Sequence, residues 1–187
     1  MKENNQTEFK LHSPAGFGGH GYFHERPFEK DMAMVNVNVT SLMLLTKLIL
    51  PDMVKRNSGK ILNVSSTASF LPGPFQAVYY ASKAFVTSFS QAISGELQGK
   101  NVTVTALCPG PVATGFIESA QIGNTNFMKN SKMALPSKTA AVGYKAMMKG
   151  KLVAFDNGLL KFSLRWLIHF LPRRTVLKIS RITMEKS

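Results

Sequence analysis

The chain has 187 residues, of which 44% are hydrophobic and 18% charged, a composition that supports one packed domain and excludes a disordered protein. A single cysteine, Cys108, excludes an intramolecular disulfide framework, and four scattered histidines offer no metal site with the spacing of zinc ligands. The formal net charge of +13 indicates an acidic partner, which could be nucleic acid, a membrane surface or a phosphorylated small molecule.

The first ten residues, MKENNQTEFK, are polar and contain no apolar segment of the secretory-signal type. No run of about 18 apolar residues is free of charge, so a membrane-spanning helix is not expected. These observations predict a cytoplasmic protein.

Alternating helices and strands are predicted beyond a polar leader over residues 1–14, which forms at best a poor strand around Phe9 and Leu11. The predicted elements are a helix over 29–57, a strand over 60–65, a helix over 78–98, a strand over 101–108, a helix over 137–150 and a strand over 152–155. Short loops join them, which is typical of βαβ units. The predicted fold class is therefore α/β with a parallel sheet.

A glycine-rich segment, Gly16-Phe-Gly18-Gly-His-Gly21, matches the G-x-G-x-x-G pattern of dinucleotide-binding loops. Such a loop must follow an apolar strand and begin a helix, so that the pyrophosphate meets the helix N-terminus. This segment follows Lys10-Leu-His-Ser-Pro14 and leads into Tyr-Phe-His-Glu-Arg-Pro27. We therefore do not expect it to bind a cofactor phosphate.

Tyr79 and Lys83 are four residues apart on a predicted helix, so they project from the same face. An ammonium group close to a phenol lowers the phenol pKa, which would let Tyr79 exchange a proton near neutral pH. Taken alone, the pair is also compatible with a solvated helix face.

Two polar residues lie in positions that could complete such a site. Ser66 follows a predicted strand at its carboxyl end, where open α/β sheets build their sites, although it could instead bond loop backbone. Asn38 occupies the middle of a predicted helix, where Asn is unfavourable. Either a local kink or a role in proton relay would explain it.

Four motifs in register resemble the short-chain dehydrogenase/reductase family: Asn38, Lys60-Ile-Leu-Asn-Val-Ser-Ser66, Tyr79-Tyr-Ala-Ser-Lys83 and Pro109-Gly-Pro-Val-Ala-Thr114. The resemblance is closest from Ala15 to Thr114. It implies a Rossmann-like sheet and NAD- or NADP-dependent interconversion of a small-molecule alcohol and a carbonyl.

The resemblance also implies roles for individual residues. Tyr79 would be the general acid/base, Lys83 would lower its pKa and hold the nicotinamide ribose, Ser66 would orient the substrate oxygen, and Asn38 would support a water-linked proton path. The family's spacing favours Ser66 over Ser65. The remaining cofactor contacts implied are Pro109, Gly110, Val112 and Thr114.

The family's first strand and its T-G-x-x-x-G-x-G loop have no counterpart among the 187 residues, and Ser13-Pro14-Ala15-Gly16 replaces N-N-A-G. The chain therefore resembles an N-terminally truncated member, with a divergent leader over 1–14, a catalytic half over 15–158 and a basic helical tail over 159–187. A non-enzymatic relic that cannot hold cofactor is the alternative to an active reductase.

The tail is basic as well as apolar, and two interpretations of it stay open. Residues 151–187 carry a net charge of +6, and Lys161, Arg165 and His169 recur every four residues. Residues 159–182 could lie on an anionic membrane surface. They could equally form helices that close the substrate pocket or make a homo-oligomer interface. Nucleic acid is not expected, because the basic residues alternate with Leu, Ile and Trp.

Overall fold

A computed structural model of the chain describes residues 10–13 and 17–186, with the side chains of residues 17–186 except Leu159, Lys161, Arg165, Leu167 and His169. Within this part of the chain, four parallel strands form one sheet in the order β1-β2-β3-β4. The strands are β1 (Lys10–Ser13), β2 (Gly59–Val64), β3 (Val102–Leu107) and β4 (Val153–Ala154). The α/β class and the parallel sheet are confirmed.

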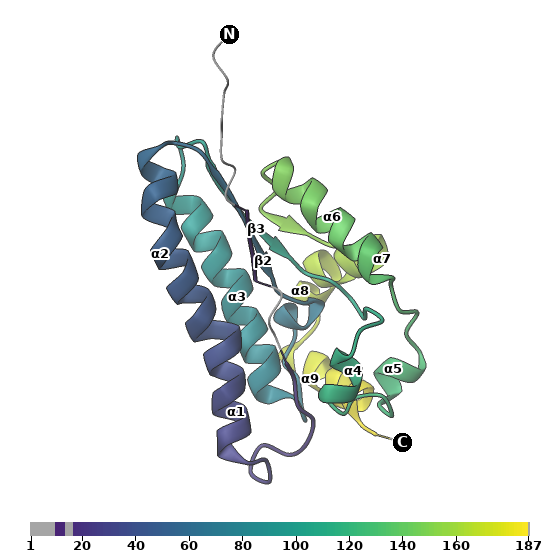
Figure 1. The fold of residues 1–187 in the computed structure, drawn as a ribbon. Coiled ribbons are helices and arrows are strands. Elements are labelled where there is room, and N and C mark those ends of the chain that lie inside the picture. Colours follow the sequence, from purple (N-terminus) through teal and green to yellow (C-terminus); the bar gives the residue numbers. More distant parts are fainter. Residues whose placement is uncertain (1–9, 14–16, 187) are drawn as a thin grey trace.

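Helices cover both faces of this sheet (Figure 1). One face carries α3 (Ala77–Glu96) and a long helix made of α1 (Phe28–Val35), a π-turn η1 (Asn36–Thr40) and α2 (Ser41–Lys55). The other face carries α6 (Pro136–Met148). Ile61 of β2 packs with Met53 on the first face, whereas its neighbour Leu62 packs with Met147 on the second. This alternation is that of a strand buried on both sides, and it fixes the three-layer arrangement.

The long helix Phe28–Lys55 corresponds to the helix predicted over 29–57. By length and composition alone it is apolar enough to cross a membrane, contrary to the expectation from the sequence, but a core helix meets the same criterion. Met34, Leu42 and Met53 are buried on its inner side. The helix therefore serves as one layer of the domain in this structure.

The beginning of the chain forms the strand that the sequence predicted only weakly around Leu11. Lys10–Ser13 lie inside the predicted leader, yet they form β1 and pair with Lys60–Asn63 of β2. Phe9, where a poor strand was also predicted, lies outside the described residues. The parallel pairing thus makes Lys10–Ser13 part of the domain, because β2 offers them a free edge.

Short helical segments join the strands at their carboxyl ends and make up the tail (Figure 1). They are η2 (Thr67–Phe70), α4 (Phe116–Ser119), α5 (Asn126–Lys129), α7 (Gly158–Phe162), a second π-turn η3 (Ser163–Leu167), α8 (Ile168–Phe170) and α9 (Arg173–Met184). The helical tail predicted from residue 159 onwards is therefore present. Its segments gather over the end of the sheet where the site lies.

Candidate active site

A cavity of about 700 Å³ lies at the carboxyl ends of β2 and β3. This is the end of a parallel sheet at which α/β proteins bind ligands. The cavity is lined by seven of the eight predicted site residues: Ser66, Tyr79, Lys83, Pro109, Gly110, Val112 and Thr114. The eighth, Asn38, is buried behind it.

Tyr79 forms the inner wall of this cavity. Its ring packs against Phe116, with the ring centroids 5.1 Å apart, and lies 6.0 Å from the ring of Tyr80. Burial raises the pKa of the Tyr79 phenol to about 12, although a hydrogen bond with the Ser66 hydroxyl acts in the opposite direction. Tyr79 is thus a protonated phenol at neutral pH, with Ser66 beside it.

Ser66 is held in place by the turn that follows β2. It caps η2, and its Oγ accepts a hydrogen bond from the backbone N–H of Ala68 at 3.1 Å. The neighbouring Ser65 points the other way, because its Oγ donates to the carbonyl of Lys83 at 2.8 Å and lies 2.7 Å from Thr87 Oγ1. The structure therefore presents the Ser66 hydroxyl, and not that of Ser65, to Tyr79.

Lys83 is buried one helical turn after Tyr79. Its Nζ donates to the carbonyl oxygen of Val64 at 3.1 Å and lies 5.9 Å from the centroid of the Tyr79 ring. Burial lowers the pKa of Lys83 to about 8. The expectation that Lys83 lowers the pKa of Tyr79 is wrong for this structure. Burial dominates the pKa of both groups, and the ammonium lies over the Tyr79 ring face, 5.9 Å from its centre.

Asn38 sits in the π-turn η1, with its side chain directed at α3. Its Nδ2 donates to Ser82 Oγ at 2.9 Å and to the carbonyl of Phe17 at 3.4 Å, while its Oδ1 is buried without a hydrogen-bond partner. Ser82 Oγ in turn donates to the carbonyl of Tyr79 at 2.7 Å. Asn38 is therefore connected to the backbone of Tyr79 and not to its phenol.

The segment from Pro109 to Thr114 forms the wall after β3, and an acid that the sequence analysis missed holds it. The backbone N–H of Gly110 donates to Asp156 Oδ1 at 3.0 Å, and Thr139 Oγ1 donates to Asp156 Oδ2 at 2.9 Å. Asp156 thus ties this wall to α6. It lies two residues after β4 and directly after the strand predicted over 152–155, so its place at the carboxyl end of a predicted strand was the available signal.

The glycine-rich segment is filled by the protein's own side chains. A Cβ atom on Gly19 would lie 2.2 Å from the Arg26 guanidinium, and one on Gly18 would lie 2.8 Å from the Phe116 ring. Arg26 is itself paired with Asp31 at 2.7 Å. The segment leads into a turn and not into a helix, and Gly16 lies outside the described residues. That Gly16–Gly21 does not bind phosphate stays a prediction.

Helix α9 covers the cavity from the side opposite the sheet, and Val176, Ile179 and Thr183 line it. The helix is held by its buried side chains Val176 and Met184, by a hydrogen bond from Ser180 Oγ to the carbonyl of Pro72, and by bonds to its last backbone carbonyls. His20 Nε2 donates to the carbonyl of Met184 at 2.8 Å, and Asn126 Nδ2 donates to that of Ile182 at 2.9 Å. Of the two interpretations of the tail, closure of a pocket therefore describes α9. The side chains of Lys161, Arg165 and His169 lie outside the described residues.

Comparisons with known proteins agree with this geometry. The family model described as short chain dehydrogenase matches residues 10–124. Over 147 residues the chain is 33% identical to the very-long-chain 3-oxoacyl-CoA reductase of Anas platyrhynchos, a match that includes 78% of this chain and 44% of that relative. The chain thus spans less than half the length of this relative.

Solved structures share the fold. A short-chain dehydrogenase from Sphingobium yanoikuyae in complex with NADPH has a TM-score of 0.72 at 22% identity, covering 88% of this chain and 66% of that one. A short chain dehydrogenase/reductase from Burkholderia phymatum in complex with NAD has a TM-score of 0.75 at 20% identity, covering 95% and 69%. At these identities the likeness establishes the fold alone.

Proposed function

Because this chain belongs to the short-chain dehydrogenase family, we propose that it interconverts a carbonyl compound and an alcohol, with NAD or NADP as the hydride carrier. The observation that carries the proposal is that Ser66, Tyr79 and Lys83 meet at one wall of a cavity of about 700 Å³. Ser66, the Tyr79–Lys83 turn of α3 and the Pro109–Thr114 segment are separate parts of the sequence, and all three line this cavity.

In this proposal Tyr79 is the general acid. With a pKa of about 12 its phenol keeps its proton throughout the neutral range, so the proton is available to a carbonyl oxygen that gains negative charge. Abstraction of a proton from an alcohol would need the phenolate, which is rare at neutral pH. In the neutral range Tyr79 is therefore in the protonated form that carbonyl reduction requires.

Ser66 and Lys83 would support that transfer in different ways. The Ser66 hydroxyl lies beside the phenol and can donate a hydrogen bond to the same substrate oxygen, which holds the oxygen against Tyr79. Lys83 is fixed by the Val64 carbonyl at the wall of the cavity, and its two remaining N–H groups can bind ribose hydroxyls. Asn38 would act only by fixing the backbone of α3 through Ser82.

The cavity fits the nicotinamide half of a dinucleotide. Tyr79 and Lys83 provide hydroxyl and ammonium donors, and the chain from Pro109 through Gly110 and Val112 to Thr114 provides the facing wall. A Cβ atom on Gly110 would come within 3.0 Å of Leu160, so the glycine keeps that wall close to the tail. When bound, the nicotinamide supplies or accepts the hydride.

We further propose that the substrate enters with an uncharged, apolar body. Lys83 is the one charged side chain among the cavity-lining residues that the structure describes, and most of the others are aliphatic or aromatic. The Anas platyrhynchos relative is named for 3-oxoacyl-CoA, whose acyl chain is of this kind. A 3-oxoacyl thioester is therefore our first candidate, and its charged carrier would lie outside the cavity.

The test is reduction of a 3-oxoacyl thioester with NADH or NADPH by the purified chain and by Tyr79→Phe. The variant should retain the wild-type fold by circular dichroism and lose nearly all turnover, because only the titrating hydroxyl is removed. Tyr22→Phe, at an exposed position outside the cavity, is the matched control. More than about a tenth of the activity in Tyr79→Phe would exclude Tyr79 as the acid. No turnover in the wild-type chain would favour a relic without activity of its own.

A further inference from the structure

The helical segment from Gly158 to Phe170, made of α7, η3 and α8, has apolar side chains on two sides. Leu160, Leu164 and Ile168 line the cavity. Phe162, Trp166 and Phe170 are instead 55%, 58% and 82% exposed. The three aromatic residues are four positions apart, so they form a row along one face of the segment, here called the aromatic row.

The exposure of three aromatic side chains in one row is unusual for a surface that contacts only water. Single apolar residues on a surface are ordinary, but a contiguous apolar patch marks a surface that contacts a protein or a membrane. The cavity side of the same segment already accounts for Leu160, Leu164 and Ile168. Packing within the domain therefore does not explain the aromatic row.

The charged residues of this part of the sequence indicate which kind of partner would contact the aromatic row. Between residues 158 and 184 the sequence contains no Asp or Glu. Arg173 and Arg174 follow Phe170 by three and four residues, at the start of α9, and both are exposed. The basic residues of this stretch are Lys161, Arg165, Arg173, Arg174, Lys178 and Arg181. Aromatic residues accompanied along the sequence by cations and by no acids match an anionic lipid surface, where rings settle at the headgroup level.

We propose that the segment from Gly158 to Arg174 binds the surface of an anionic phospholipid membrane, with Phe162, Trp166 and Phe170 inserted at the interface. A second copy of the chain is disfavoured as the occupant, because pairing through this face would bring two like-charged tails together in a protein of net charge +13. Binding requires neither substrate nor cofactor, so the proposal does not depend on the proposed function.

Trp166 allows a direct test, since it is the single tryptophan of the chain. The full chain is mixed with vesicles of phosphatidylcholine, with or without phosphatidylglycerol, and is assayed by sedimentation and by tryptophan emission. We expect sedimentation with the anionic vesicles, a blue shift of the emission, and quenching by phospholipids brominated on their acyl chains. Raising the salt should weaken binding, because it screens the charges.

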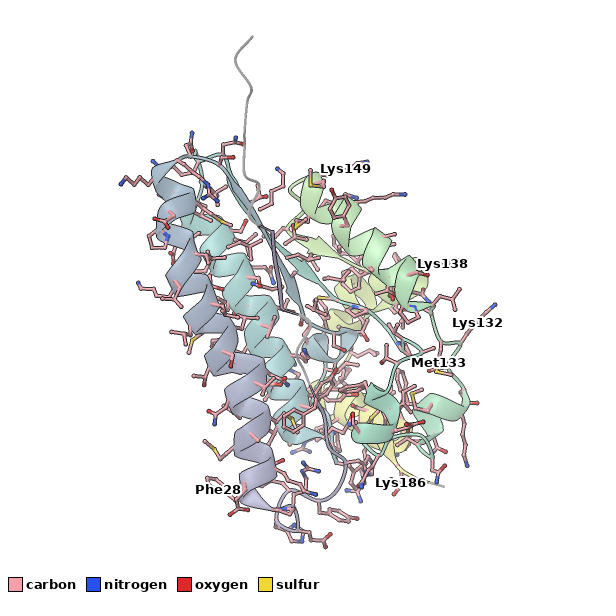
Figure 2. All side chains as sticks on the ribbon, viewed as in Figure 1. Phe28, Lys132, Met133, Lys138, Lys149 and Lys186 are labelled. Atoms are coloured by element: carbon pink, nitrogen blue, oxygen red, sulfur yellow. The ribbon has the colours of Figure 1, made fainter. Side chains whose placement is uncertain are left out.

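Two matched triple variants separate this surface from the rest of the molecule. Phe162→Ser/Trp166→Ser/Phe170→Ser should abolish sedimentation. Phe28→Ser/Leu44→Ser/Leu48→Ser removes side chains that are 70%, 57% and 65% exposed on the long helix and should leave sedimentation unchanged. Figure 2 shows Phe28 at the end of that helix, well away from the tail.

The charge contribution is tested by Arg173→Gln/Arg174→Gln, which should weaken partitioning roughly thirtyfold, about fivefold for each cation near the surface. Equal binding to neutral and anionic vesicles would overturn the proposal. So would sedimentation without a change in Trp166 emission, or loss of binding only in the long-helix variant. A blue shift that grows with protein concentration in the absence of lipid would show self-association instead.

Discussion

Replacing Lys83 with methionine is expected to stabilise the protein at neutral pH while it removes activity. Lys83 is buried next to Tyr79, and its Nζ has one hydrogen-bond acceptor among the described residues, the carbonyl of Val64. Methionine has a similar length and volume and carries no charge. The substitution therefore removes a buried ammonium without leaving a large cavity.

The magnitude follows from the lowered pKa. A fall from the ordinary value of 10.5 to about 8 corresponds to about 3 kcal/mol by which burial disfavours the ammonium. Loss of the hydrogen bond from Lys83 to the Val64 carbonyl costs about 1 kcal/mol and reduces the gain in stability by that amount. Below pH 8 both folded and unfolded chains carry the charge, so the variant should be more stable by about 2 kcal/mol.

Between pH 8 and 10.5 the unfolded wild-type chain binds the Lys83 proton while the folded chain releases it, so wild-type stability rises with pH in this window. Lys83→Met has no titrating group at this position, so the amount by which it is more stable than wild type should shrink towards zero near pH 10. Tyr79 and Tyr80 have raised pKa values, so they begin to destabilise the fold only above about pH 10.

Urea unfolding at about pH 7 and about pH 9.5 measures the effect, with the exposed Lys100→Met as the control. The stability difference between Lys83→Met and wild type should fall by at least about 1 kcal/mol between the two conditions, whereas that for Lys100→Met should stay constant. A variant that is less stable than wild type by the same amount at both pH values would refute the argument that burial disfavours the Lys83 charge.

Two further predictions concern glycine positions and the cofactor. A Cβ atom on Gly73 would lie 2.1 Å from the buried Tyr80 ring, so Gly73→Ala should destabilise the fold by about 2 kcal/mol. On α3, no atom lies within 4 Å of the position that a Cβ atom on Gly95 would take, so Gly95→Ala should stabilise the fold by about 0.5–1 kcal/mol. If the two glycine variants shift the midpoint of urea unfolding in the same direction, these two predictions are wrong. The 187-residue chain should bind NADH and NADPH only in the millimolar range, because Tyr79, Lys83 and Thr114 would contact the nicotinamide half of the cofactor alone. A loss of about 4 kcal/mol of binding free energy from the other half weakens binding roughly a thousandfold. A micromolar dissociation constant from a fluorescence titration would disprove it.

The long helices and central strands were predictable because their signals are local. The apolar spacing from Val35 to Met53 and the β-branched run from Asn101 to Cys108 each indicate one structure within a short window. The four-residue helices α4 and α5 were not predicted. They depend on contacts far along the chain, such as the backbone bond from Asn126 N–H to the carbonyl of Glu185.

Within the site, the sequence pattern was enough to select Ser66, Tyr79 and Lys83, and the structure places all three on one cavity. The pKa of Tyr79 was predicted in the wrong direction, because spacing along a helix gives the distance between two groups but not how much water reaches them. The contribution of Asp156 was missed for a similar reason. Its partners Gly110 and Thr139 lie 46 and 17 residues away.

The attachment of α9 has a consequence for how the cavity wall can vary. Its fastenings at His20 and Asn126 are to main-chain oxygens, which every amino acid possesses. Ile179 lines the cavity and is half-exposed, so a substitution there would change the cavity wall and leave these two bonds in place. The shape of this cavity wall can therefore vary at Ile179 while the main-chain attachment of α9 stays the same.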